Sequence, residues 1–228
     1  MENKRLINEL YNVDCISWLA ERERERVDLT LTDIPYGVVN RKHGTLRKAG
    51  NLDKGTADEP TFELQDFLER VYDITIGTII IFCAKEQLSE IYNYFNEKQK
   101  QKQGTVRQII WEKTNPSPMN GQYVYLSGIE NAVWFRKKGG TFNARCKNPV
   151  FKYPKGNSKV HPTEKNHKLL KELILDNSNV GDIVFDPCAG SASTLLCAKQ
   201  LGRNYIGCEI DEHWYEIGKQ RLKEIENV

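Results

Sequence analysis

The chain has 228 residues, 39% of them hydrophobic, which is typical of one compact domain that needs neither disulfides nor metals to fold. Its longest apolar run, around residues 78–84, is much shorter than the roughly 18 residues of a membrane span, and residues 1–11 are charged and polar. We therefore expect a single-domain cytoplasmic protein without a membrane partner. The net charge of +2 is unevenly distributed, because residues 136–160 contain eight Lys or Arg and no Asp or Glu, which leaves about −6 on the rest.

Cysteine and histidine spacing excludes two further classes of site. None of the six cysteines forms a Cys-x-x-Cys pair, and most of them lie in apolar segments, so we expect buried, reduced thiols. The four histidines show no paired ligand spacing, so we expect no metal.

Segments rich in β-branched residues alternate with helical patterns along the chain. Predicted strands cover residues 10–13, 27–32, 78–82, 106–111, 131–135, 182–185 and 205–208. Predicted helices cover residues 62–73, 86–98, 164–177, 193–201 and 212–226, each with apolar residues three and four apart. The alternation predicts an α/β fold, a mostly parallel seven-stranded sheet with helices on both faces.

Three stretches, residues 37–60, 114–128 and 138–160, are rich in turn residues and too long to be simple connections. Long loops on an α/β scaffold commonly carry function. The third combines basic residues with Phe142, Phe151 and Tyr153, a composition suited to phosphates and exposed bases. A solvated loop is the alternative interpretation of that stretch.

The first chemical motif is Asp33-Ile34-Pro35-Tyr36, which follows a buried strand. An aromatic amino nitrogen is a poor nucleophile, because its lone pair is delocalised into the ring. A carboxylate at Asp33 and the carbonyl of Ile34 can each accept one of its N–H groups and direct the lone pair at an electrophilic methyl. Tyr36 can stack on a base swung out of its helix. The four residues alone are also compatible with an ordinary β-turn.

The second motif begins with Asp186, which ends a buried strand and is followed by a turn at Gly190 and a helix. No Gly-Lys-Ser/Thr follows and the three-glycine dinucleotide pattern is missing, so neither a Walker loop nor a dinucleotide site is predicted. The next strand ends in Glu209, at the spacing where a carboxylate accepts hydrogen bonds from ribose hydroxyls. A helix cap at Asp186 and a surface Glu209 are the structural alternative.

Three motifs in this order resemble the amino-methylating DNA methyltransferases of the permuted type, in which the catalytic motif precedes the cofactor motif. Residues 33–36 resemble Asp-Pro-Pro-Tyr, residues 161–165 resemble His-Pro-Thr-Gln-Lys, and residues 186–193 resemble Asp-Pro-Phe-x-Gly-Ser-Gly-Thr. Ile34, Ala192 and Asn166 depart from the family pattern. The resemblance covers nearly the whole chain and implies a Rossmann-like fold that uses S-adenosyl-L-methionine.

The resemblance also implies roles for individual residues. It places the reacting amine at Asp33, Ile34, Pro35 and Tyr36. It implies that the cofactor contacts Asp14, Cys15, His161, Thr163, Lys165, Asp186, Pro187, Cys188, Gly190, Ser191, Glu209 and Ile210. Together with the charge pattern, it implies DNA contacts from Arg41, Lys42, Arg47, Lys48, Lys138, Arg145, Lys147, Lys152 and Lys155. We therefore expect a mobile catalytic loop near 37–60 and a small target-recognition insert near 138–160.

The implied reaction is methylation of adenine N6 in double-stranded DNA, since relatives acting on cytosine N4 more often carry Ser-Pro-Pro-Tyr. Cytosine N4 stays open, as do RNA and a silent cofactor-binding sensor. The resemblance is compatible with a homodimer and with a cognate restriction enzyme, neither of which the sequence identifies. The recognition insert is small, so one subunit is expected to read a short or degenerate site, with residues 41–48 and 115–125 as further candidates for base contacts.

Overall fold

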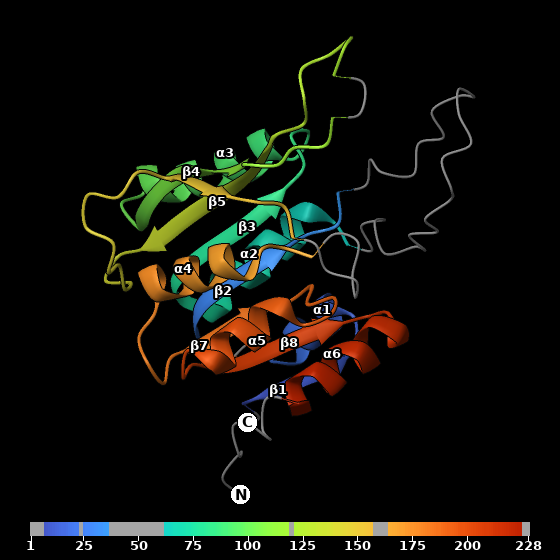
Figure 1. The fold of residues 1–228 in the computed structure, drawn as a ribbon. Helices are drawn as coiled ribbons and strands as arrows, with labels where there is room; N and C mark the ends of the chain where they lie inside the picture. Colours follow the sequence, from blue (N-terminus) through green and yellow to red (C-terminus); the bar gives the residue numbers. More distant parts are fainter. Residues whose placement is uncertain (1–6, 23–24, 37–61, 119–120, 157–163, 225–228) are drawn as a thin grey trace, which may run out of the picture.

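The computed structural model describes residues 7–22, 25–36, 62–118, 121–156 and 164–224. Over these residues a single sheet of eight strands runs through the molecule in the order β1-β8-β7-β2-β3-β5-β4-β6 (Figure 1). The strands are β1 (Glu9–Asn12), β2 (Val27–Asp33), β3 (Thr75–Cys83), β4 (Gly104–Lys113), β5 (Ile129–Lys137), β6 (Val150–Tyr153), β7 (Ile183–Asp186) and β8 (Asn204–Glu209). Strand β5 runs antiparallel to β3 and β4, and the other pairs are parallel.

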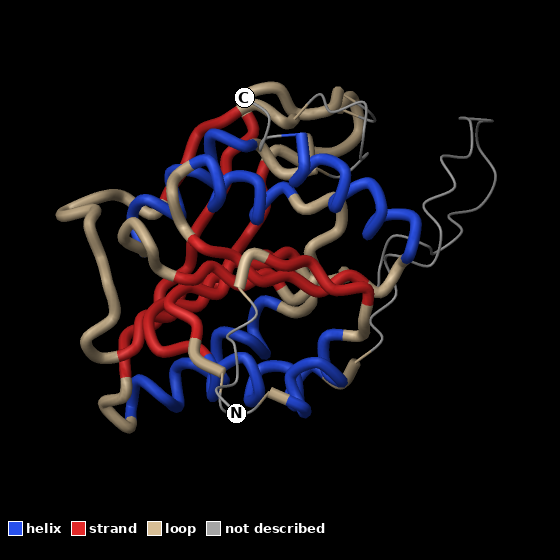
Figure 2. Tube along the Cα trace, turned by 90° about the horizontal axis from the view of Figure 1, so that it is seen from below, coloured by secondary structure: helices blue, strands red, loops and turns tan. Residues whose placement is uncertain are grey.

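Helices cover both faces of the sheet (Figure 2). Their bounds are α1 (Cys15–Glu21), α2 (Leu64–Ile74), α3 (Leu88–Lys100), α4 (His167–Asn177), α5 (Ser193–Gln200) and α6 (Glu212–Glu224). Apolar residues of α1, α2 and α3 pack in one core cluster, and those of α4, α5 and α6 pack in the other. Among the described residues no helix is long and apolar enough to span a bilayer.

The central strand β3 contains a continuous apolar run over residues 79–83 because both of its faces are buried. In β3, Ile79 and Ile81 pack in the cluster under α2 and α3, whereas Ile80 and Phe82 pack in the cluster under α4. The predicted α/β class and the mostly parallel sheet are therefore confirmed.

The prediction of seven strands was wrong. The eighth, β6, lies at the sheet edge and pairs with β4 inside the stretch assigned to irregular structure. It has four residues between Pro149 and Pro154, too few for its alternation to be recognised against turn-forming neighbours.

The topology places a ligand site at the carboxyl ends of β2 and β7. These two strands are neighbours, with Leu29 opposite Val184 and Thr30 opposite Phe185. The chain leaves β2 for α2 on one face and leaves β7 for α5 on the other. Such a switch point opens a crevice at the strand ends.

Candidate active site

The turn after β2 is held firmly in place. Ile34 is 2% exposed, and its backbone N–H donates to the Phe82 carbonyl at 3.2 Å. Gln87 Nε2 donates to the Pro35 carbonyl at 3.0 Å, while its Oε1 accepts from Ala84 N at 3.0 Å. The turn is thus tied to the end of β3 at both positions, which fixes the direction of the Asp33 side chain.

Asp33 is the first member of a chain of alternating charges. Lys165 Nζ lies 2.6 Å from Asp33 Oδ2 and 2.7 Å from Glu130 Oε2, and Lys113 Nζ lies 2.6 Å from Glu130 Oε1. The Tyr36 hydroxyl donates to Asp33 Oδ1 at 2.8 Å. We call Asp33, Lys165, Glu130 and Lys113 the charge cluster. Its two cations and two anions balance, so this partly buried group carries no net charge.

Burial and charge act against each other in this cluster. Burial lowers the pKa of Lys165, but Asp33, Tyr36 and Glu130 outweigh that effect and hold it well above its usual value. Burial raises the pKa of Asp33, and Lys165 opposes the rise. For Glu130, the lysines outweigh burial and its pKa is lowered. Lys165 is therefore a permanent cation beside a carboxylate whose proton affinity is raised.

The cofactor motif forms a turn with open space above it. Asp186 ends β7 at 3% exposure, accepts from Cys188 N at 3.1 Å, and has its pKa raised by burial to about 6. Gly190 adopts φ +51°, and a Cβ built there would meet nothing within 4 Å. Its N–H donates to Glu209 Oε2 at 2.7 Å. Ala192 has φ +65°, a left-handed conformation that suits the glycine found there in the family pattern.

The second carboxylate of the cofactor half is oriented by backbone groups. Glu209 Oε1 accepts from Asp211 N at 2.8 Å, and burial raises the pKa of Glu209. Asn12 Nδ2 donates to the carbonyls of Glu209 and Ile210, which ties the ends of β1 and β8 together. The Ile210 side chain is 54% exposed beside this carboxylate, an apolar surface on which a flat base can rest.

Other residues expected at the cofactor have structural partners as well. Asp14 caps α1 by accepting from Ser17 N at 2.9 Å, and Cys15, in the first turn, is buried. Ser191, from the glycine turn, is 4% exposed, and its Oγ accepts from Arg221 Nη1 at 2.8 Å. Pro187 lies between Asp186 and Cys188, at the start of the turn.

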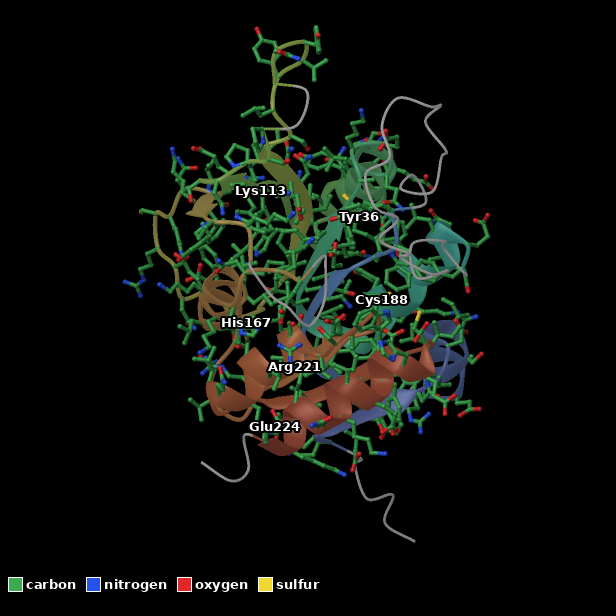
Figure 3. The ribbon with its side chains drawn as sticks, turned by 45° about the vertical axis from the view of Figure 1, so that its right-hand side comes forward. Tyr36, Lys113, His167, Cys188, Arg221 and Glu224 are labelled. Carbon is green, nitrogen blue, oxygen red and sulfur yellow. The ribbon has the colours of Figure 1, made fainter. Side chains whose placement is uncertain are left out.

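Glu164 and Lys165, adjacent in sequence, connect the two halves of the site. Glu164 Oε1 accepts from Ser193 Oγ at 2.6 Å and lies 2.5 Å from Arg221 Nη2, whereas Lys165 enters the charge cluster. Asn166 then caps α4 by accepting from Lys168 N at 2.9 Å. In Figure 3, Tyr36 and Lys113 of the catalytic half lie above Cys188 and Arg221 of the cofactor half.

The site residues suit S-adenosyl-L-methionine. The open face over Gly190 gives a ligand close access to the backbone, Glu209 is oriented to accept from ribose hydroxyls, and Ile210 offers an apolar face. The described residues contain no group of three or more potential metal ligands. Together, the fold and this site define a Rossmann-like methyltransferase domain.

The chain belongs to the N6/N4 DNA methylase family, whose model matches residues 27–220. It is 27% identical to the type II methyltransferase M.HinfI of Haemophilus influenzae, over 96% of this chain and 69% of that protein. It is 26% identical to M2.DpnII of Streptococcus pneumoniae, over 94% of this chain and 89% of that protein. The M1.HpyAVI complex with S-adenosylmethionine superimposes with a TM-score of 0.73 at 28% identity, covering 93% of this chain and 98% of that one. The protein is therefore an S-adenosylmethionine-dependent DNA methyltransferase.

Several predicted site residues lie outside the described residues. These are His161 and Thr163 of the expected cofactor set and the DNA candidates Arg41, Lys42, Arg47 and Lys48. The expected mobile loop near 37–60 lies outside them too.

The remaining DNA candidates are not brought to one surface, because β5 reverses the chain direction. Lys152 and Lys155 lie at or after the carboxyl end of β6, on the active-site edge. Lys138 follows β5, and Arg145 and Lys147 precede β6, so all three lie toward the opposite edge. Lys147 is also paired with Glu172 and Asp176. The basic stretch of the sequence is thus two separate groups.

The sequence motifs did not assign roles to Glu130, Lys113 or Gln87. Glu130 and Lys113 lie next to the strands predicted over residues 131–135 and 106–111, but only their approach across β4 and β5 shows that they extend the charge cluster. Gln87 belongs to a helix start and carries no motif signal. Side chains that act through another residue have no fixed sequence spacing from it.

Proposed function

We propose that the protein transfers a methyl group to N6 of an adenine extruded from double-stranded DNA. The observation that carries this proposal is the Asp33 carboxylate, fixed at the end of β2 beside the cofactor turn and held by Lys165 at 2.6 Å. Chemistry on a base edge requires the base to leave the stack, and the end of β2 lies at the switch-point crevice.

Asp33 retains hydrogen-bonding capacity for the substrate amine. A carboxylate offers about four lone-pair positions, and Tyr36 and Lys165 take one on each oxygen. A further position can accept one N–H of the amine, and the Ile34 carbonyl can accept the other. These two bonds favour the pyramidal nitrogen of the transition state over the planar ground state.

The bound cofactor supplies an electrophilic methyl group on a sulfonium centre. As the new N–C bond forms and the S–C bond breaks, the amine nitrogen becomes positively charged and must lose one proton. Asp33 stabilises that charge and can accept the proton, since burial raises its pKa. Lys165 keeps the carboxylate oriented and ionised before the reaction, and Glu130 holds Lys165 in place.

Cytosine N4 is the second candidate, because its amino group presents the same geometry. The PvuII cytosine-N4 methyltransferase shares this fold with a TM-score of 0.71, but a sequence identity of 15% supports only the shared fold. The aspartate at position 33 favours adenine, since the resembling cytosine enzymes more often carry serine there.

The test is product analysis with isotopically labelled S-adenosylmethionine and, in separate reactions, unmethylated DNA or RNA, with the labelled nucleoside identified by mass spectrometry. We expect N6-methyl-2′-deoxyadenosine from double-stranded DNA with wild-type protein. The matched control is Asp33→Asn, which keeps the shape of the side chain but removes the anionic acceptor. This variant should still bind the cofactor but transfer no methyl group. Labelled N4-methyl-2′-deoxycytidine, or label in RNA alone, would overturn the proposal.

A further inference from the structure

The loop between β4 and β5, residues 114–128, carries an apolar tip that no part of the site explains. Tyr125 is 102% exposed, Tyr123 80%, Val124 61% and Leu126 43%. The loop contains no charged residue, in a chain where 28% of residues are charged. Contiguous exposed apolar side chains mark a contact surface.

The base of this loop is built into the active site. Lys113 and Glu130, which flank it, bond to each other at 2.6 Å within the charge cluster. Lys113 N donates to the Gly128 carbonyl at 2.7 Å, and Lys155 N donates to Asn115 Oδ1 at 2.5 Å. The loop projects beyond the sheet in both Figure 1 and Figure 3. Its tip therefore stands in a defined position relative to Asp33.

The chemistry of the tip suits the interior of a duplex. Without Lys or Arg it cannot neutralise phosphates, a task that exposed Lys152 and Lys155 at the same edge can perform. Extruding a base leaves a gap between two flat, apolar base faces. Aromatic side chains stack on such faces, and apolar wedges enter unstacked steps in DNA-bending proteins.

We propose that the tip of the β4–β5 loop enters the duplex at the target base pair, with Tyr125 stacking in the gap that the extruded adenine leaves. This rests on the proposed function. The loop would then stabilise the extruded state, while the charge cluster at its base engages the amine.

The experiment compares the single-turnover methylation rate at saturating DNA for wild type, Tyr125→Ala and Tyr125→Phe. The two substrates are a normal duplex and a duplex in which the target adenine faces an abasic site. We expect Tyr125→Ala to lose about 10- to 100-fold on the normal duplex, the range typical of losing one base–aromatic stack, and Tyr125→Phe to keep most of the activity. The loss should shrink on the abasic duplex, because no base pair has to be broken there and extrusion is nearly complete even without the stack. Val180→Ala, which truncates a 76% exposed side chain elsewhere, should leave both rates unchanged.

Equal losses on both duplexes, or no loss on either, would overturn the assignment of the loop to the duplex. A second result would also overturn it: Tyr125→Ala differs from wild type in oligomeric state by sedimentation, while the ratio of its rates on the two duplexes equals that of wild type. The tip would then be a contact between copies of the chain. Wild-type protein that methylates neither duplex would instead contradict the proposed function itself.

Discussion

Replacing Lys165 with Met tests the charge cluster most directly. The substitution keeps most of the side-chain volume but removes the cation between Asp33 and Glu130. Breaking a buried ion pair from one side typically costs about 3–5 kcal/mol. The lower end applies here, because Glu130 keeps Lys113 and Asp33 keeps the Tyr36 hydroxyl. For a domain of this size, a loss of about 3 kcal/mol lowers Tm by roughly 6–12 °C, which calorimetry measures.

The pH dependence separates an electrostatic role from simple damage to the fold. Asp33 must be ionised to accept the amine N–H, so kcat falls as pH drops through its pKa. Lys165 lowers the pKa of Asp33 against the larger effect of burial. Without this lysine the pKa rises, and the acid limb of the kcat profile should move to higher pH.

Glu130→Gln is the matched variant, and it should shift the acid limb of the kcat profile in the opposite direction. Glu130 raises the pKa of Asp33 by charge repulsion, so its neutralisation should move the acid limb to lower pH. Single-turnover methylation across pH, for both variants at a temperature where each is folded, gives the comparison. Limbs that moved in the same direction, or an unchanged limb in Lys165→Met, would refute the assigned electrostatic role.

Three further outcomes are expected. Glu209→Ala should weaken cofactor binding in calorimetry by roughly 10- to 100-fold, since it removes a charged acceptor and leaves the Gly190 N–H unpaired; an unchanged Kd would remove Glu209 from the cofactor site. The double variant Lys152→Ala and Lys155→Ala should bind DNA with a smaller dependence on salt: the slope of log affinity against log salt should fall by about 0.9 for each phosphate that the protein no longer neutralises. The control is Lys138→Ala, at the opposite edge, which should leave this slope unchanged. Equal slopes for the two variants would contradict the division of the basic residues into two groups. Methyl transfer should persist in excess EDTA, because a sulfonium leaving group needs no Lewis acid, and loss of turnover restored by one divalent ion would show otherwise.

The sequence predicted the central fold because its signals are redundant there. Strands β3 and β7 contain apolar runs, and β2 alternates Val and Leu with Asp and Thr, so none of the three resembles a turn-rich loop. The predictions failed where one residue decides a boundary. Helix α4 was expected from residue 164 but begins at His167, because the Asn166 side chain caps it.

The site was predictable where the backbone itself delivers a residue. Asp33, Asp186 and Glu209 each end a parallel strand, so strand prediction alone brings them to one edge of the sheet. Glu130 could not be found in this way. It lies at the start of an antiparallel strand and reaches the site only because β5 runs in the reverse direction, which local periodicity does not reveal.

The positions of Glu164 and Lys165 explain why a short motif is needed between the catalytic half and the cofactor half of the site. When the catalytic strand precedes the cofactor strand in sequence, no single loop runs from one motif directly to the other. Lys165 fixes the carboxylate that receives the amine, and its neighbour Glu164 joins the start of α5 through Ser193 and α6 through Arg221. A shift of this segment would therefore move the Asp33 acceptor and the cofactor turn together. The distance and alignment between the amine nitrogen and the methyl carbon would then be preserved, and methyl transfer depends on both.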